Sequence, residues 1–311
     1  MLLFLDCDTG IDDALAIGLL LTHEDVRLIG VGTVNGNTSA VRAAANTAGL
    51  LALAGRDDIP VAVGVGEHRA DARHVHGDNG VGGVALPEGA PHDPRTAAGM
   101  LVDLAREHAG ALHVLATGPC TNLAAALRAE PRLPELVASV TVMGGALRVR
   151  GNINPYAEFN IAADPLAAAA VFAAGWPVTL VPLDVTLEHR WTTRDWQRLG
   201  GSPLNDALHA MLPTYFDAYE ARFETREIAL HDPLAAGIAV GDLTPAEAPS
   251  LKLGVDPTTG QILEQPGAGP RVRVVLSLTA PAGPAMLQRL LDASTAAAPQ
   301  TASPDAHPGA Y

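Results

Sequence analysis

Four aspartates near the start of the chain are close enough together to bind a metal ion or to carry out acid–base chemistry. They lie in the stretch FLDCDTGIDDALAIG (4–18), at Asp6, Asp8, Asp12 and Asp13. The first Lys or Arg of the chain is Arg27, so no neighbour in the sequence balances their charge. Carboxylates held this close raise one another's pKa unless a cation joins them. A hard divalent cation, bound by oxygen ligands, would supply the missing positive charge.

Part of this pattern has a purely structural explanation. Asp12 and Asp13 fall in the first turn of an expected helix, 12–22, where backbone N–H groups and the helix dipole favour acidic side chains. For a single aspartate, helix capping is the commoner explanation. Alternate residues of an extended strand share a side, so Asp6 and Asp8 would face the same way. Four carboxylates at one strand-to-helix junction therefore favour a cation site.

The elements that must position these residues are short apolar runs that alternate with helical segments. Continuous Val, Ile and Leu runs separated by helices are typical of parallel strands covered on both faces. We therefore expect one α/β domain, 1–294, with a doubly wound, mostly parallel sheet and helices on both faces. The expected strands are 2–6, 26–34, 59–65, 111–117, 139–145, 177–184 and 271–278, and the expected helices are 12–22, 39–55, 96–108, 121–129, 164–174 and 283–294. The Pro- and Ala-rich tail, 295–311, is expected to be disordered.

Polar residues follow several of these strands at the point where each strand ends. They are Asp6–Asp8, NGN (35–37), Thr117, MGG (143–145) and Asp184. In open α/β sheets, ligands bind outside the carboxyl ends of the strands. The pattern therefore indicates an active site built from segments that are distant in the sequence.

Composition narrows the possible functions. The chain has 311 residues, of which 48% are hydrophobic, so it can bury a sizeable core. Its net charge of −14 argues against a nucleic-acid-binding protein, which usually carries a basic face. Lys252 is the only lysine, which weakens a phosphate-binding P-loop or a Schiff-base enzyme as an interpretation.

Cysteine content and apolar runs bear on the location of the protein. Only Cys7 and Cys120 are present, which excludes a disulfide scaffold and a Cys-rich zinc site and fits a reducing cytoplasm. No secretory signal is visible. The longest apolar stretch, 166–183, is interrupted by Gly175 and Pro177, so it predicts a buried helix and strand and not a membrane span. We expect a cytoplasmic protein.

Six motifs, in order, resemble those of the inosine–uridine-preferring nucleoside hydrolases (nucleoside N-ribohydrolases). They are DCDTGIDDALAI (6–17), TVNGN (33–37), HGDNGVGG (76–83), ATGPCTNLAAAL (116–127), VMGGALRVRGNINPYAEFNIAADPLAA (142–168) and HDPLA (231–235). The resemblance extends to about residue 294. It implies the nucleoside hydrolase fold, hydrolysis of the N-glycosidic bond of ribonucleosides in salvage or catabolism, and assembly as a homodimer or homotetramer.

The resemblance also implies a metal site and a mechanism. Ca²⁺ would be bound by Asp8, Asp13, the backbone carbonyl of Thr117, and Asp232. Two ribose hydroxyls and a water would complete its oxygen shell. Asp8 would take a proton from the metal-bound water, which would attack C1′ as the bond to the base breaks. Direct attack by water implies inversion at C1′.

Further positions match residues that contact the substrate in the family. On the sugar side these are Asp12, Asn37, Met143, Asn152, Glu158 and Asn160. On the base side they are His231 as general acid, His76, and the aromatic pair Tyr215 and Tyr219. These residues also have purely structural interpretations. GNINPYAEFN could form a polar turn, and Met143 and the two tyrosines could pack in the core. The other histidines considered are interpreted as surface or core residues: His68, His74, His92, His108, His113, His189 and His209.

Three other functions remain open. The first is hydrolysis of a modified or non-standard ribonucleoside at the same metal and sugar site. The second is a non-catalytic protein that binds ribose or nucleosides, against which the presence of Asp8 argues. The third is a haloacid-dehalogenase-like phosphatase. Gly10 stands where that family has Thr, and no lysine precedes Lys252, so this alternative is the weakest.

Overall fold

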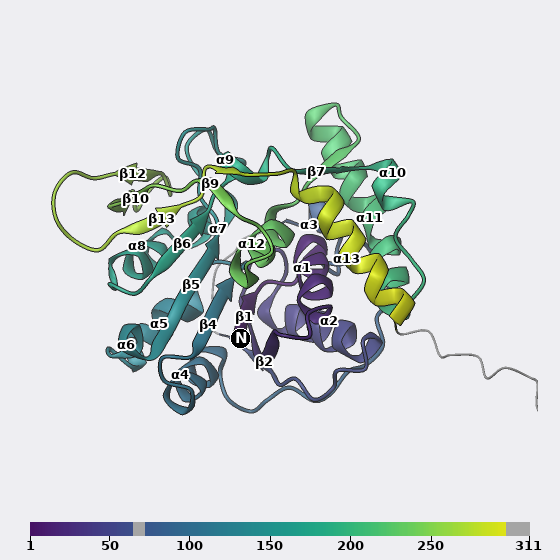
Figure 1. Ribbon diagram of the computed structural model, residues 1–311, viewed down its shortest axis with the longest axis horizontal. Helices are drawn as coiled ribbons and strands as arrows, with labels where there is room; N and C mark the ends of the chain where they lie inside the picture. Colours follow the sequence, from purple (N-terminus) through teal and green to yellow (C-terminus); the bar gives the residue numbers. More distant parts are fainter. Residues whose placement is uncertain (65–71, 297–311) are drawn as a thin grey trace, which may run out of the picture.

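The central sheet of the protein brings the polar strand ends together. In the computed structural model, which describes residues 1–64 and 72–296, eight strands form this sheet (Figure 1). They are β1 (Leu2–Cys7), β2 (Arg27–Thr33), β3 (Val61–Val63), β4 (Leu112–Ala116), β5 (Val137–Met143), β6 (Val178–Val181), β10 (Ser250–Leu251) and β13 (Val272–Val274). Their order is β10-β13-β6-β5-β4-β1-β2-β3. Every neighbouring pair is parallel except β10 with β13, which confirms the predicted doubly wound, mostly parallel sheet.

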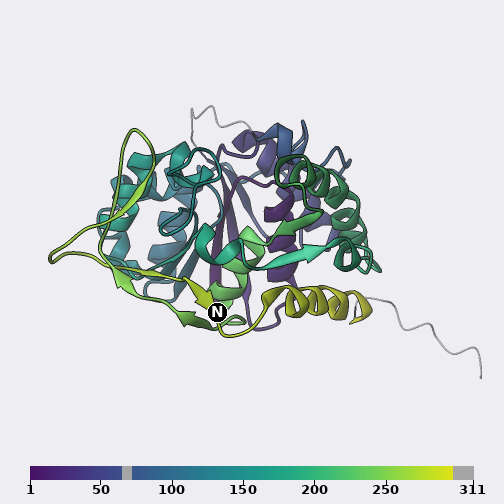
Figure 2. The ribbon, with the colours of Figure 1, turned by 90° about the horizontal axis from the view of Figure 1, so that it is seen from above.

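Helices cover both faces of the sheet, as Figures 1 and 2 show. They are α1 (Ile11–Leu21), α2 (Ala40–Leu53), α3 (Arg73–His76), α4 (Ala97–Glu107), α5 (Thr121–Ala129), α6 (Leu133–Leu136), α7 (Phe159–Ala163), α8 (Pro165–Ala173), α9 (Leu183–Thr186), α10 (Thr193–Trp196), α11 (Pro203–Phe223), α12 (His231–Val240) and α13 (Ala282–Ala296). Leu3 and Leu5 of β1 join a core with α1, α11 and α12, whereas Phe4 joins a second core with α4, α5 and α8. Both sides of β1 are therefore buried, which is why its sequence is continuously apolar.

Three two-stranded ribbons were not predicted from the sequence. They pair β7 (Arg190–Thr192) with β8 (Glu227–Ala229), β9 (Pro245–Glu247) with β14 (Ser277–Leu278), and β11 (Leu253–Val255) with β12 (Ile262–Glu264). The expected strand 271–278 is thus two short strands, β13 and β14. Strands of two or three residues are too short to show a clear period of two in the sequence.

Parts of some sequence predictions lie outside the described residues. These are residue 65 of the expected strand 59–65, His68, and residues 297–311 of the tail. Helix α13 ends at Ala296, two residues beyond the predicted end of the domain at 294. The domain boundary therefore stays a prediction.

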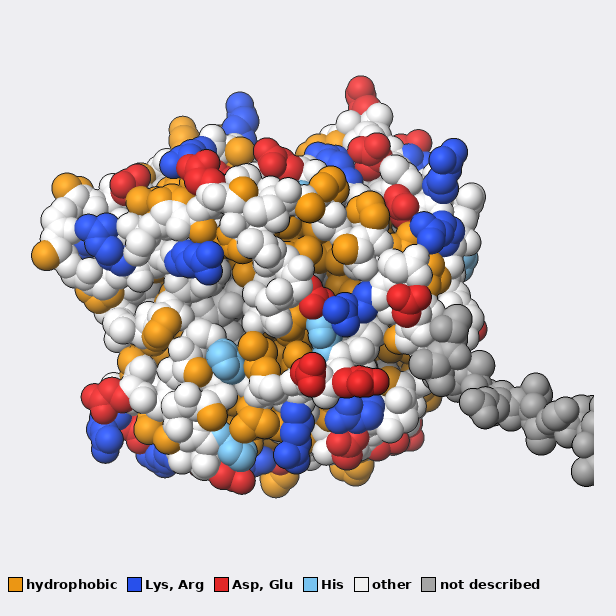
Figure 3. Space-filling model, viewed as in Figure 1, with side chains coloured by type: hydrophobic (Ala, Val, Ile, Leu, Met, Phe, Trp, Pro, Cys, Tyr) orange, Lys and Arg blue, Asp and Glu red, His pale blue; other side chains and the backbone are white. Residues whose placement is uncertain are grey.

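The surface and the helices bear on possible partners. None of the helices in the described part of the chain is long and apolar enough to cross a membrane. On the face seen in Figure 3, arginine side chains lie scattered among acidic ones and form no continuous basic strip. This face therefore lacks the electrostatic footprint of a nucleic-acid-binding surface.

The strand order reverses beside β1, and this reversal creates the crevice for the site. From β1 the chain passes to β2 and β3 on one side, and then crosses back to β4, β5 and β6 on the other. Ligands of doubly wound sheets bind at such a reversal, outside the carboxyl ends of the strands. Asp8 follows β1 and Thr117 follows β4, so both residues lie at this point.

Gly36, in the loop after β2, allows this loop to approach the acidic cluster closely. A Cβ atom on Gly36 would lie 1.8 Å from Oδ2 of Asp8, which is far inside van der Waals contact. We expect Gly36→Ala to lower the free energy of unfolding by about 1–3 kcal/mol, because the loop must move away from a buried side chain. Denaturant unfolding would measure the change.

Gly99→Ala is the matched control for this substitution. Gly99 lies in the first turn of α4, where a Cβ would meet only the hydroxyl of Thr96, at 3.1 Å. Alanine favours helix over glycine by about 1 kcal/mol, so this variant should be as stable as the parent or more so. Equal stability of the Gly36→Ala variant and the parent would contradict the close approach of the loop to Asp8.

Candidate active site

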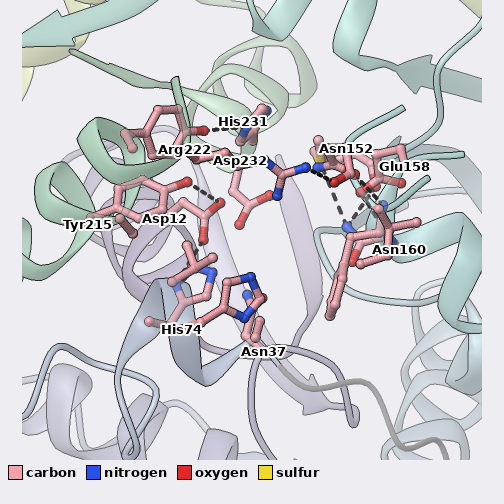
Figure 4. Close-up of a pocket in the computed structure, with 18 of the residues that line it drawn as sticks. Asp12, Asn37, His74, Asn152, Glu158, Asn160, Tyr215, Arg222, His231 and Asp232 are labelled. Carbon is pink, nitrogen blue, oxygen red and sulfur yellow. Dashed lines mark hydrogen bonds and ion pairs between the residues drawn. The ribbon is translucent and has the colours of Figure 1, made fainter. Parts of the chain in front are cut away.

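A cavity of about 820 Å³, measured to its open mouth, lies at the carboxyl ends of the strands (Figure 4). Most of the site residues predicted from the sequence line it: Asp12, Asn37, His76, Thr117, Met143, Asn152, Glu158, Asn160, Tyr215, Tyr219, His231 and Asp232. The two remaining predicted residues, Asp8 and Asp13, are fully buried and both contact Asn37. The fold therefore gathers all fourteen positions around one cavity.

Buried carboxylates lie at one end of this cavity. Oxygen atoms of Asp12, Asp13 and Asp232 all lie within 4.8 Å of one another. The side-chain amide of Asn37 donates to both Asp8 Oδ1, at 3.2 Å, and Asp13 Oδ2, at 3.1 Å. Asp8 is therefore joined to the group through Asn37, while Asp12, predicted as a hydroxyl contact, belongs to the tightest part of it.

Asp13 is held in place by hydrogen bonds from three segments. Besides Asn37, the backbone N–H of Gly10 donates to its Oδ2 at 2.8 Å, and the hydroxyl of Thr117 donates to its Oδ1 at 2.7 Å. Asp13 lies in the first turn of α1, so the helix-capping explanation is also correct for this residue. Asp13 can therefore cap α1 and also belong to the acidic cluster.

The acidic cluster lacks a compensating positive charge. Burial, and next the charge of Asp13, raise the pKa of Asp8 well above its usual range. Burial, and next the charge of Asp12, do the same to the pKa of Asp232. Among the described residues that line the cavity, Arg222 is the one Arg or Lys. A group of buried oxygen donors that repel one another fits a hard divalent cation.

Asp6 does not line the cavity. The side-chain amide of Asn122 donates to its Oδ1 at 2.8 Å, and its Oδ2 has no hydrogen-bond partner among the described residues. Burial is the main reason that its pKa rises to about 7, and the bond from Asn122 partly opposes this rise. Asp6 thus lies beside the site, at the start of α5, and not in it.

The sugar-side residues belong to a loop that is fixed by its own side chains. Glu158 caps α7 and accepts hydrogen bonds from the backbone N–H groups of Gly145, Asn160 and Ile161, at 2.8, 2.8 and 3.1 Å. Asn152 Oδ1 accepts from the N–H of Phe159 at 2.9 Å. GNINPYAEFN is therefore the polar turn that composition suggests, and it also lines the cavity.

Asn160 connects this loop to the end of β4. Its side-chain amide donates to the carbonyl of Thr117 at 2.7 Å and to that of Met143 at 3.2 Å. A carbonyl oxygen has two lone pairs, so the Thr117 carbonyl can accept this bond and still bind a cation.

Aromatic and imidazole side chains from α3, α11 and α12 form the opposite wall. Tyr215 donates to Asp12 Oδ2 at 3.2 Å. His231 is bonded at both nitrogens: Nδ1 to the hydroxyl of Thr186 at 2.7 Å, and Nε2 to that of Tyr219 at 2.8 Å. Burial lowers the pKa of His231 to about 4, which favours neutral imidazole. Tyr215 and Tyr219 also pack in the core, which confirms their interpretation as core residues, while their contact with the base stays a prediction.

His76 has a defined tautomer in this geometry. Its Nδ1 accepts a hydrogen bond from the backbone N–H of Ile11 at 3.1 Å, which leaves the proton of the neutral ring on Nε2. Burial lowers its pKa to about 4, and the ring stacks on Tyr215 with centroids 5.4 Å apart. His76 can therefore donate one hydrogen bond from Nε2.

Several residues that line the cavity were not predicted from the sequence. His74, interpreted as a surface or core residue, lines it beside His76, and Ile153, Arg222 and Phe223 also line it. One signal could have found Arg222. It follows Tyr215 and Tyr219 at seven and three residues, so all three share one face of α11.

Comparisons with known proteins decide the family. The sequence profile described as "Inosine-uridine preferring nucleoside hydrolase" matches residues 3–282. The chain belongs to this family. It is 36% identical to a protein named probable uridine nucleosidase 2 of Arabidopsis thaliana, over 74% of each chain. It is 34% identical to the inosine-uridine preferring nucleoside hydrolase of Crithidia fasciculata, over 76% of this chain and 78% of that one.

A solved structure agrees with this assignment. The purine-preferring ribonucleoside hydrolase from Gardnerella vaginalis superposes with a TM-score of 0.88 at 29% identity, and the match covers 96% of this chain and 100% of the other. The chain is therefore an N-ribohydrolase that acts on ribonucleosides. The names of these relatives cover uridine, inosine and purine preference, so they do not decide the base that this nucleoside hydrolase prefers.

The charge of the acidic cluster predicts how pH and a cation affect stability. Aspartates titrate near about 3.9 in the unfolded chain, and their pKa values are raised in the fold. Folded aspartates therefore hold protons that unfolded ones release. The metal-free protein should lose stability as pH rises from about 4 through these raised values. A bound cation would replace the protons, so adding Ca²⁺ should raise Tm more at pH 8 than at pH 5.

Thermal unfolding of chelator-treated protein, with and without added Ca²⁺ at the two pH values, measures this effect. K⁺ at matched ionic strength controls for general screening. An equal rise in Tm at both pH values would show that the cation binds elsewhere than at the buried carboxylates.

Proposed function

We propose that this nucleoside hydrolase is Ca²⁺-dependent and that Asp8 is its general base. The observation that carries the proposal is the cluster of buried carboxylate oxygens of Asp12, Asp13 and Asp232, which lie within 4.8 Å of one another and repel when charged. Asp8, Asp13, Asp232 and the Thr117 carbonyl would hold the ion. When bound, the ion would neutralise the carboxylates, bind the 2′- and 3′-hydroxyls of ribose and acidify a water molecule.

Hydrogen bonds from Asn37 fix the orientation of Asp8. The backbone N–H of Asn37 donates to Oδ2 at 2.6 Å and its side-chain amide donates to Oδ1 at 3.2 Å. A general base must hold one lone pair toward the proton that it removes. With both oxygens fixed by one residue, Asp8 keeps a single orientation toward the water that attacks C1′. Attack from the side opposite the base inverts C1′.

The cavity gives the two halves of a nucleoside different surroundings. Polar side chains of Asn152, Glu158 and Asn160 lie along one wall, beyond the carboxylates, and would bind the ribose. Tyr215, Tyr219, His76 and His231 line the other wall and would contact the base. The reacting C1′–N bond would then lie between the walls, above the acidic cluster.

The hydrogen bonds of His231 determine how it would protonate the leaving base. Both of its ring nitrogens are bonded to hydroxyl groups, and the hydroxyl on Nε2 is that of Tyr219. Protonated His231 would pass its Nε2 proton to the Tyr219 oxygen while the Tyr219 hydroxyl gives its own proton to the base, which leaves His231 neutral. His231 and Tyr219 would act as one unit.

Membership of the family does not specify the exact substrate, the assembly or the location of the protein. A modified or non-standard ribonucleoside would use the same carboxylates and the same sugar wall, with different contacts at the base. Homodimer or homotetramer assembly, a cytoplasmic location and a role in nucleoside salvage or catabolism stay predictions from the resemblance and from the two cysteines.

Release of free ribose from inosine, uridine, cytidine, adenosine and guanosine, with and without a Ca²⁺ chelator, tests the proposal directly. We expect chelator-sensitive release, restored by added Ca²⁺. The Asp8→Ala variant should lose activity by several orders of magnitude, because general base and ligand are lost together. Chelator-resistant hydrolysis would overturn Ca²⁺ dependence. No hydrolysis of any of the five, with Ca²⁺ bound, would favour a non-standard ribonucleoside or a binding protein.

The role of His231 predicts a dependence on the leaving group. His231→Ala should slow inosine hydrolysis by about 10²–10⁴-fold, the usual contribution of general acid catalysis. It should slow p-nitrophenyl riboside much less, because that leaving group needs no proton. Tyr219→Phe should show the same pattern, and the double variant should be little worse than either single one. His113→Ala, a substitution in the middle of β4 beside Ser139, is the control.

Steady-state kinetics on both substrates would decide this point. If His231→Ala slows the two substrates equally, His231 does not act as an acid. If the losses in the two single variants multiply in the double variant, the two residues act independently.

A further inference from the structure

Arg222 joins the two walls of the cavity. It lies in the last turn of α11, on the wall that carries Tyr215 and Tyr219, and its guanidinium donates to the backbone carbonyl of Asn152 on the opposite wall. Figure 4 shows its side chain crossing the cavity between these walls. The bond connects residues seventy positions apart in the sequence.

The guanidinium is held on both sides. Besides the Asn152 carbonyl, it contacts the ring of Phe223, with Cζ 5.3 Å from the ring centroid. Helix α11 ends directly after these residues, at Glu224, whose φ of 56° is left-handed. The last turn is exposed, so the contact with Asn152 anchors this turn against the sugar-side loop. A planar guanidinium suits such a position because it can stack on a ring and donate in its own plane.

Asn152 is the residue through which this bond would reach the substrate. Its side chain accepts from the Phe159 N–H, its carbonyl accepts from Arg222, and it lines the cavity. Its backbone is thus tied to α11 and its side chain to the start of α7. Without Arg222, the loop that includes Asn152 would lose its hydrogen bond to α11, while Asn154 would still donate to the carbonyl of Thr259 at 3.1 Å.

We propose that Arg222 is a positioning residue, which holds Asn152 against the ribose by tying the sugar-side loop to the last turn of α11. This inference rests on the proposed function in one respect, namely that Asn152 faces the sugar. Arg222 acts on the sugar although it belongs to the base-side helix. Its loss therefore weakens binding of a ribose ring that has no base at all.

Calorimetric binding of 1,4-anhydroribitol, a ribofuranose ring without a base, to the Ca²⁺-loaded protein tests this inference. We expect Arg222→Ala to raise the Kd of this compound about 10-fold, the effect of one lost charge-assisted hydrogen bond. The KM for inosine and uridine should rise by a similar factor, with kcat changed less. Arg222→Lys should restore part of the affinity, because an ammonium group can still donate to a carbonyl.

A double-mutant cycle with Asn152→Ala separates positioning from direct contact. If Arg222 acts through Asn152, removing Arg222 from the Asn152→Ala variant should change the Kd by less than 2-fold. Arg226→Ala is the matched control, since Arg226 follows the same helix end and pairs with Asp217 and Glu220 without lining the cavity. It should leave the Kd unchanged.

Each other outcome has a distinct meaning. A raised KM with an unchanged Kd for 1,4-anhydroribitol would overturn the inference and place Arg222 on the base. Multiplicative effects in the cycle would overturn the link to Asn152. No binding of the sugar ring to the parent protein would also overturn it. Sugar binding without hydrolysis of any nucleoside would refute the proposed function and leave the Arg222 result to be read from the Kd values.

Discussion

The structure depends on the burial of several aspartate side chains of like charge at one end of a cavity. Asp8, Asp13 and Asp232 are almost fully buried, and Asp12 is nearly so. Burying charges of one sign is costly unless they are protonated or joined by a cation. The fold provides backbone N–H groups, the amide of Asn37 and the hydroxyl of Thr117 to these oxygens, and none of these donors carries a charge. The carboxyl groups must therefore either hold protons or share a cation, and this requirement defines the site.

The strand order makes this cluster possible. Asp8 follows β1, Asn37 follows β2, Thr117 follows β4, and Asp232 begins α12, which packs on α1. Because β1 lies between β2 and β4, the three strand ends are neighbours at the reversal of strand order. Gly36 lets the loop after β2 approach Asp8 more closely than any residue with a Cβ would allow.

The proposed sugar-binding and base-release functions are supported by two different parts of the structure. The sugar wall is a turn whose polar side chains bond its own backbone, as in Glu158 and Asn152. The base wall is one face of the long helix α11, with His231 bonded to it through Tyr219. Arg222 connects these supports through its hydrogen bond to the carbonyl of Asn152. Names of related proteins differ in base preference, which fits a fixed sugar site facing a more variable base wall.

The sequence by itself determined the doubly wound sheet and most of its strands and helices, and the resemblance of its motifs to those of nucleoside hydrolases indicated the residues that surround the cavity. Buried parallel strands are continuously apolar, and the acidic and Asn-containing motifs stand at their ends, so both signals are local. Tertiary structure alone decided which polar atoms meet. It placed Asp6 against Asn122 outside the cavity, bonded His231 to Tyr219, and added His74 and Arg222 to the walls. These contacts join segments far apart in the chain, and their geometry depends on how helices pack across the sheet, which no local pattern records.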